Sequence, residues 1–158
     1  WVQAVIDAAS MSGTERILDV YCGMGNFSLP LARRAASVVG VEDYAPSIAM
    51  ANCNAESNSI GNVEFYAMSA ENALARFEQP FDLLVLDPPR AGAYQLVKQL
   101  AAKPVDSIIY VSCDPQTLAR DLKHLLLSGY QVVSSQAFDM FPQTYYVESV
   151  TALKRITR

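Results

Sequence analysis

Apolar runs rich in β-branched residues alternate along the chain with segments of helical periodicity. The apolar runs predict seven strands; a helical segment precedes the first of them, and others fill most intervals up to residue 130. No internal repeat or low-complexity stretch interrupts the alternation. We expect strands at 16–21, 37–41, 62–66, 81–86, 106–112, 130–138 and 146–153, and helices at 2–10, 27–36, 45–57, 69–76, 94–101 and 115–127.

Short connections between strands and helices favour right-handed βαβ units, which build a mostly parallel sheet with helices on both faces. The last interval differs, because residues 138–144 contain Pro142 and little helical periodicity. We therefore expect the last two strands to pair antiparallel at one edge. The predicted fold class is α/β, with a seven-stranded, mostly parallel sheet.

Composition limits the classes of protein that fit this pattern. The chain has 158 residues, of which 51% are hydrophobic and 18% charged, which predicts one folded domain and excludes intrinsic disorder. No apolar run reaches the roughly 18 residues that span a bilayer, so we expect no membrane partner. The sequence starts at Trp1 without an initiator Met or a basic leader, and we expect it to be part of a longer cytoplasmic protein.

Cysteine usage and net charge restrict the chemistry further. Cys22, Cys53 and Cys113 form neither an even disulfide framework nor a Cys-x-x-Cys metal pair, which fits a reducing cytoplasm and no bound metal. The net charge is −4 at pH 7, whereas nucleic-acid-binding domains usually carry a basic face. If the protein acts on nucleic acid, we expect residues outside this sequence to make most of the contacts with it.

A glycine turn follows the first expected strand and leads into a helix. Ligands of parallel sheets bind beyond the carboxyl ends of the strands, and the helix amide groups at such a turn suit nucleotide-like ligands. A dinucleotide motif would continue Gly23-x-Gly25 with a glycine at position 28, where this chain has Ser28. Glu42, seventeen residues past Gly25, is placed to accept hydrogen bonds from both ribose hydroxyls of an adenosine ligand. The alternatives are a plain tight turn and a solvated acidic loop; the two features together favour an adenosine ligand.

Two further chemical groups follow the fourth and fifth expected strands. Asp87 precedes two prolines, which stiffen the turn and could hold its carboxylate against a planar ligand; the alternative is a helix-capping Asp. Cys113 directly precedes a helix that Asp114 would cap and Pro115 would begin, and the helix dipole there favours a thiolate. The alternative is a small buried thiol, and the carboxylate of Asp114 disfavours the thiolate.

Glu148, in the last expected strand, has the surroundings of a proton acceptor. By the two-residue period of a strand it shares a face with Val150 and Ala152, and this apolar setting would raise its pKa toward the range of proton transfer. The alternative is a solvated carboxylate on an edge strand. His124 lies in a helical segment and is expected at the surface or the edge of the core.

Three sets of motifs resemble those of one enzyme family. Asp-Pro-Pro-Arg-Ala-Gly at 87–92 and, fifteen residues on, Ile-Ile-Tyr-Val-Ser-Cys-Asp-Pro-Gln-Thr at 108–117 resemble the signature of the RNA uracil-5 methyltransferases. Residues 138–148 resemble the second signature of that family, and residues 19–27 resemble its S-adenosylmethionine loop. The resemblance implies a Rossmann-like class I methyltransferase fold with an antiparallel last strand, in which residues 1–158 form the catalytic domain.

The resemblance also implies an activity and the residues that carry it. Members of the family transfer a methyl group from S-adenosyl-L-methionine to C5 of a uridine in RNA, and for this chain we favour ribosomal over transfer RNA. Cys113 matches the nucleophile that adds to C6, Glu148 the general base, and Asp87 a residue that positions the uracil. The residues that match cofactor contacts are Tyr21, Gly23, Gly25, Asn26, Glu42, Ser69 and Asp87.

The chain departs from the family pattern at three positions. Asp114 replaces the usual Asn, Tyr146 replaces a His two residues before the base, and Ser69 replaces an acidic residue that meets the adenine amine. An N-terminal RNA-binding domain, a central segment with a cofactor-contacting Gln and, in some members, iron–sulfur cysteines are further parts of the family that this sequence does not contain. We expect a monomer that contacts its RNA substrate mainly through those parts.

Two rival interpretations remain from the sequence. The first is another class I methyltransferase, acting on an amine or a small molecule, with Cys113 structural. Amino-directed enzymes commonly have an aromatic residue after Asp-Pro-Pro, and Arg90 stands there instead. The second is a nucleotide-binding dehydrogenase or a non-catalytic adenosine-binding module, and Ser28 counts against the dehydrogenase.

Overall fold

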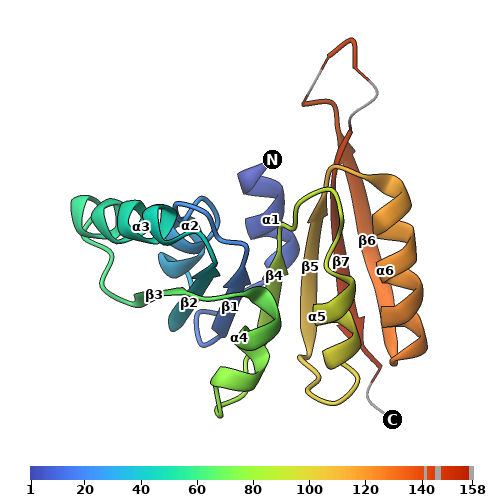
Figure 1. Cartoon of the computed structure of the whole chain (residues 1–158), viewed down its shortest axis with the longest axis horizontal. Helices are drawn as coiled ribbons and strands as arrows, with labels where there is room; N and C mark the ends of the chain where they lie inside the picture. The colour runs from blue at the N-terminus through green and yellow to red at the C-terminus, as the bar shows by residue number, and fades with distance from the viewer. Residues whose placement is uncertain (141, 145–146, 157–158) are drawn as a thin grey trace.

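The computed structural model describes residues 1–140, 142–144 and 147–156, and in them a seven-stranded sheet carries helices on its faces. The strand order is β3-β2-β1-β4-β5-β7-β6, from left to right in Figure 1. This confirms the predicted fold class. The strands are β1 (Arg16–Val20), β2 (Ser37–Glu42), β3 (Val63–Ala67), β4 (Leu83–Leu86), β5 (Ser107–Ser112), β6 (Tyr130–Phe138) and β7 (Glu148–Arg155). The helices are α1 (Val2–Ala9), α2 (Ser28–Ala32), α3 (Ala45–Ser57), α4 (Ala70–Arg76), α5 (Tyr94–Gln99) and α6 (Pro115–Leu127).

The strand directions bring the carboxyl ends of the first five strands to one edge of the sheet. β1 lies between β2 and β4 and pairs parallel with both, and β4 continues the parallel pairing to β5. The chain therefore winds outward in one direction from β1 to β3 and in the other from β4 to β5. Such a switch point opens a crevice beyond the carboxyl ends of the strands, where ligands of α/β sheets bind.

The last two strands pair antiparallel with each other, as the sequence predicts. β7 inserts between β5 and β6 and is also antiparallel to β5, so it is an interior strand and β6 forms the edge. The alternative that Glu148 sits on an edge strand is therefore wrong. Its strand, β7, pairs with β5 on one side and with β6 on the other.

Burial of both faces of the sheet explains why its strands read as nearly continuous apolar runs. Leu18 of β1 packs in a cluster with residues of α4, α5 and α6, whereas the adjacent Ile17 packs in a cluster with residues of α1 and α2. All four residues of β4 are buried. No helix within the described residues is long and apolar enough to cross a membrane.

Some boundaries differ from the sequence-based ones. α2 ends at Ala32 rather than at residue 36, because the Ala36 N–H already donates to the Glu15 carbonyl oxygen at the start of β2. β1 ends at Val20, since Tyr21 adopts a left-handed φ of 64° that interrupts the strand. The predicted first residue of the last strand, Tyr146, lies outside the described residues.

Candidate active site

The glycine turn lies at the carboxyl edge of the sheet, between β1 and α2. Gly25 N donates to the Cys22 carbonyl oxygen at 2.9 Å, and Gly23 and Gly25 have φ values of 54° and 89°. A Cβ atom on Gly25 would lie 3.1 Å from the side chains of Leu29 and Phe65, so packing requires glycine there. A Cβ atom on Gly23 would meet nothing within 4 Å. Side chains therefore pack against the turn at Gly25, whereas the space next to Gly23 is open. This open space fits a ligand in contact with the Gly23 backbone.

Glu42 ends β2 and faces this turn. Its Oε2 accepts a hydrogen bond from Gly23 N at 3.3 Å, and its Oε1 accepts one from Tyr44 N at 3.1 Å. Each carboxylate oxygen has two lone pairs, so both retain acceptor capacity for the hydroxyls of a ribose. The glycine turn and the acidic residue, which the sequence suggests separately, are thus one site with its carboxylate already oriented.

Asp19, in β1 beneath the turn, is a site residue that the sequence reasoning missed. Its side chain is fully buried, Ser28 Oγ donates to its Oδ2 at 2.5 Å, and its Oδ1 has no hydrogen-bond partner within the described part of the chain. Burial raises the pKa of Asp19 to about 7, and the nearby charge of Asp87 adds to the shift. An Asp inside an apolar strand is the signal that could have revealed it. Ser28 also gains an explanation, because it supplies a hydroxyl where a dinucleotide motif has glycine.

Asp87 follows β4 at the same edge. Its backbone N–H donates to the Val20 carbonyl oxygen at 3.4 Å, which ties the start of this turn to the end of β1. Burial raises the pKa of the Asp87 carboxyl to about 7, and the negative charge of Glu148 adds to the shift. Asp87 therefore lies within electrostatic reach of two other carboxyls, Asp19 and Glu148.

The structure brings Cys113 and Glu148 to adjacent strands at this edge. Ser112, the last residue of β5, pairs with Ser149 of β7, and Ser149 Oγ donates to the Ser112 carbonyl oxygen at 3.2 Å. Cys113 directly follows Ser112 and Glu148 directly precedes Ser149, so both residues adjoin the last pair of this antiparallel ladder. Glu148 is partly buried, and desolvation raises its pKa, in the direction that the sequence predicts.

Asp114, next to the thiol, caps the following helix. Its carboxylate accepts hydrogen bonds from Gln116 N at 3.0 Å and Thr117 N at 2.9 Å. The bond from Thr117 N is the main reason that the pKa of Asp114 lies below its usual range. The carboxylate is thus bound to the N-terminus of α6, and its negative charge is opposed there by the helix dipole.

The other predicted cofactor residues lie around the same edge but are not equally close to Glu42. Ser69 directly precedes α4 and makes no side-chain capping bond; it lies just beyond β3, where Ala67 pairs with Glu42. Tyr21 is half-buried against the core cluster under α4–α6. Asn26 is exposed and lines a hollow of about 360 Å³ that Asn54 of α3 and Asn58, just after α3, also line, so it faces the other side of the turn.

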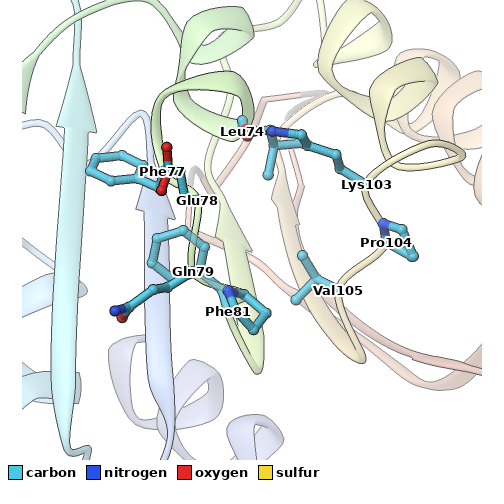
Figure 2. Close-up of a pocket in the computed structure, with 9 residues that line it drawn as sticks. Leu74, Phe77, Glu78, Gln79, Phe81, Lys103, Pro104 and Val105 are labelled. Carbon is cyan, nitrogen blue, oxygen red and sulfur yellow. Dashed lines mark hydrogen bonds between the residues drawn. The ribbon is translucent and has the colours of Figure 1, made fainter.

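A separate pocket of about 210 Å³ lies at the opposite edge of the sheet. Figure 2 shows Phe81 and Val105, which precede β4 and β5, facing the same space as Leu74 and Lys103. Lys103 Nζ donates to the Leu74 carbonyl oxygen at 2.8 Å across one side of it. Because it opens at the amino ends of the strands, this pocket is not part of the active site.

The chain is similar to known RNA methyltransferases in sequence and in structure. A family model described as tRNA (Uracil-5-)-methyltransferase matches residues 1–156. The 23S rRNA (uracil(1939)-C(5))-methyltransferase RlmD of Pseudomonas aeruginosa (strain UCBPP-PA14) is 43% identical over 152 residues, which cover 94% of this chain and 34% of the relative. RlmD of Stenotrophomonas maltophilia (strain R551-3) is 44% identical over 154 residues, covering 95% and 35%. The tRNA (uracil-54, C5)-methyltransferase of Pyrococcus abyssi, solved in complex with S-adenosyl-L-homocysteine, superposes with a TM-score of 0.82 at 38% identity, covering 96% of this chain and 37% of that one.

These matches extend over nearly the whole chain, although the chain spans only about a third of the length of the curated relatives. They confirm the family that the motifs at 19–27, 87–92, 108–117 and 138–148 indicate. They also confirm the Rossmann-like methyltransferase fold. The chain belongs to the tRNA (uracil-5-)-methyltransferase family.

Proposed function

We propose that this protein transfers a methyl group from S-adenosyl-L-methionine to C5 of a uridine in RNA, through a covalent bond between Cys113 and C6. The observation that supports the proposal is the pairing of Ser112 with Ser149, because Cys113 and Glu148 directly adjoin this pair and the charge of Glu148 acts on Asp87. A nucleophile, a proton acceptor and a polar anchor for the base thus share one edge with a nucleoside-binding turn.

The residues at the glycine turn fit the methyl donor. Glu42 would accept from the ribose hydroxyls, and the open face above Gly23 would receive the ligand at close range. When bound, S-adenosylmethionine supplies a methyl group on a positively charged sulfur. The carboxyl of Asp87 lies at the same edge of the sheet and, when ionised, would offer negative charge to that cation.

Cys113 makes C5 of the uracil nucleophilic. Its thiolate forms a bond to C6, and the electron pair of the C5–C6 double bond moves into the ring to give an enolate. The enolate carbon C5 then takes the methyl group, and the bond between that group and the donor sulfur breaks with its electron pair on sulfur. The thiolate is required because uracil C5 is a poor nucleophile as long as the C5–C6 double bond is in place.

Glu148 completes the reaction as the general base. It takes the C5 proton, the electron pair left behind re-forms the C5–C6 double bond, and the Cys113 thiolate departs. A raised pKa suits this role, because a carboxylate of ordinary acidity is a weaker proton acceptor. Removal of the C5 proton by Glu148 thus leads to the release of Cys113.

Asp87 would orient the base. Its ionised carboxylate accepts a hydrogen bond from uracil N3–H, and this contact discriminates against cytosine, whose N3 carries no proton. A buried acceptor left without a donor costs about 1–3 kcal/mol, which sets the scale of the discrimination. A target uridine within structured RNA must also be unstacked, at a cost of a few kcal/mol.

We favour ribosomal over transfer RNA as the substrate, since the two relatives at 43% and 44% identity are named 23S rRNA methyltransferases. The family model and the Pyrococcus abyssi enzyme are named for tRNA, which makes transfer RNA the competing substrate. Incubation of the protein with unmodified ribosomal and transfer RNA and methyl-labelled donor decides between them. Label in transfer RNA alone would overturn the preference.

The covalent mechanism is tested by comparing two variants on a denaturing gel with substrate RNA and methyl-labelled S-adenosylmethionine. Cys113→Ala should form no adduct, whereas Glu148→Gln should accumulate a denaturant-resistant protein–RNA adduct that already carries the label. The difference arises because Glu148→Gln can still add and methylate but cannot remove the C5 proton.

The controls separate chemistry from folding and binding. Both variants should retain the far-ultraviolet circular dichroism spectrum and the RNA affinity of the wild type. Label in an adduct of Cys113→Ala would overturn the role of Cys113. Absence of adduct from a folded, RNA-binding Glu148→Gln would overturn the order of steps and favour a methyltransferase with Cys113 structural.

A further inference from the structure

The loop between Asp87 and α5 contacts α6, the helix that begins two residues after Cys113. Thr117 Oγ1 donates to the Arg90 carbonyl oxygen at 3.0 Å, and Arg120 Nη2 donates to the Ala91 carbonyl oxygen at 2.8 Å. Both bonds run from α6 side chains to loop backbone. These two bonds attach the loop backbone to α6.

Asp121 of α6 is a buried residue that also connects α6 to this loop. Its side chain has no exposed surface, although it is a carboxylate. Its Oδ2 accepts from Ala93 N at 2.8 Å and from Tyr110 Oη at 2.7 Å, and its Oδ1 accepts from Arg120 Nε at 2.9 Å. Ala93 is the residue before α5, and Tyr110 belongs to β5. One carboxylate thus joins α6, the strand that leads to Cys113 and the end of the loop that starts at Asp87.

The loop backbone is shaped for this close approach. Gly92 has a φ of 75°, and a Cβ atom there would lie 2.6 Å from Asp121 Oδ2, 2.7 Å from Arg120 Nη2 and 3.2 Å from Thr117 Cβ. Any side chain at position 92 would push the loop away from α6. Glycine at this position therefore serves the contact with Asp121.

We propose that Asp121 is a positioning residue that sets the distance between Asp87 and Cys113. The inference rests on the proposed function, in which Asp87 holds uracil N3 while Cys113 attacks C6, on the opposite side of the ring. α6 carries Cys113 at its N-terminus and, through Asp121, holds the loop of Asp87. Productive attack needs the two groups aligned within a fraction of an ångström, and a misplacement of about 1 Å can reduce a rate by about 100-fold.

Two substitutions at this position separate the anchoring oxygen from the charge. Asp121→Asn keeps an oxygen that can accept from Ala93 N and Tyr110 Oη, and Arg120, whose side chain is 43% exposed, can turn to solvent. Asp121→Ala removes both carboxylate oxygens, so Tyr110 loses this acceptor and Ala93 N–H keeps only its bond to Tyr110 Oη, at 3.0 Å. Leu125→Ala is the matched control, because Leu125 is a fully buried α6 side chain of the hydrophobic core and makes none of the loop bonds.

The first measurement is the single-turnover rate of label transfer from methyl-labelled S-adenosylmethionine to substrate RNA, at saturating concentrations and well below the unfolding midpoint of each variant. We expect a loss of about 10- to 100-fold for Asp121→Ala and of no more than about fivefold for Asp121→Asn and Leu125→Ala. Affinity for S-adenosylhomocysteine should stay within about twofold in all three, because Glu42 and the glycine turn are not attached to α6. A wild-type rate for Asp121→Ala, or an equal loss for Leu125→Ala, would overturn the proposal.

The second measurement, amide hydrogen exchange, does not depend on the reaction. Asp121→Ala should speed exchange in residues 89–93 while β1 and β2 keep their protection, and Asp121→Asn should keep most of the wild-type protection. Unchanged exchange in 89–93 would overturn the anchoring role. A wild-type protein that transfers no methyl to uridine, combined with the expected exchange pattern, would instead show that the proposed function is at fault and that the anchor exists.

Discussion

The backbone N–H of Gly23 donates to Glu42 Oε2 at 3.3 Å, which joins the turn after β1 to the end of β2. Tyr44 N holds the other carboxylate oxygen, at 3.1 Å. Glu42 therefore has few orientations to lose on binding, and a preoriented acceptor binds at a lower entropic cost than a mobile one.

Glu42→Ala should weaken binding of S-adenosylhomocysteine. The ribose hydroxyls lose a charged acceptor worth about 1.5–3 kcal/mol, which corresponds to roughly 10- to 150-fold in affinity. Isothermal titration calorimetry measures the change. Asp43→Ala, at the exposed neighbouring position, is the control and should bind as the wild type does. Equal affinities for wild type and Glu42→Ala would remove Glu42 from the cofactor site.

Asp19 should make the free energy of unfolding fall as the pH rises. Its pKa is about 7 in the folded chain and ordinary in the unfolded chain, so between these values only the folded state keeps the proton. From pH 5 to pH 8, the free energy of unfolding of Asp19→Asn should therefore rise relative to that of the wild type by about 2–3 kcal/mol.

Urea titrations at both pH values measure this difference. Asp43→Asn is the control, because Asp43 is exposed and its substitution should leave the pH dependence of the wild type in place. Parallel pH profiles for Asp19→Asn and the wild type would show that Asp19 is ionised in the folded protein at neutral pH.

Asp87 should make recognition of the target uridine depend on pH. Burial and the charge of Glu148 raise its pKa to about 7, and only the ionised carboxylate can accept from N3–H with full strength. In the Cys113→Ala background, which excludes adduct formation, RNA affinity should rise by about tenfold between pH 6 and pH 8. Fluorescence anisotropy follows the binding. Adding Asp87→Asn should flatten the profile, and a pH dependence that survives it would assign the titration to another group.

Asp114→Asn should leave the rate of methyl transfer within about threefold of the wild type. The carboxylate is hydrogen-bonded to Gln116 N and Thr117 N, and an Asn oxygen can accept the same bonds. Asp114→Ala, which removes the cap, should lower the thermal unfolding midpoint, whereas Asp114→Asn should not. A large acceleration in Asp114→Asn would mean that the carboxylate opposes the Cys113 thiolate despite its place at the helix end.

The parts of the fold that the sequence predicts correctly depend on local pattern. The apolar runs of β4 and β5, the Pro at the first position of α6 and the glycine turn each report a preference of a short segment, and none needs a distant partner. The motifs around Asp87 and Cys113 are equally local. Local preference is weaker at element ends, as α2 shows: the helix ends at Ala32, four residues before the predicted end.

The sequence by itself determined the fold class, the family and the candidate site residues: a glycine turn with an acidic partner, a thiol just before a helix and a carboxylate in the last strand. Only the tertiary structure decided that β7 inserts beside β5, so that Glu148 and Cys113 adjoin the same strand pair, and that Asp19 and Asp121 are fully buried carboxylates. The physical reason is that a side chain's burial, pKa and hydrogen-bond partners depend on residues far away in the chain. Periodicity can predict that a segment is a strand, but it does not show which strand pairs with it.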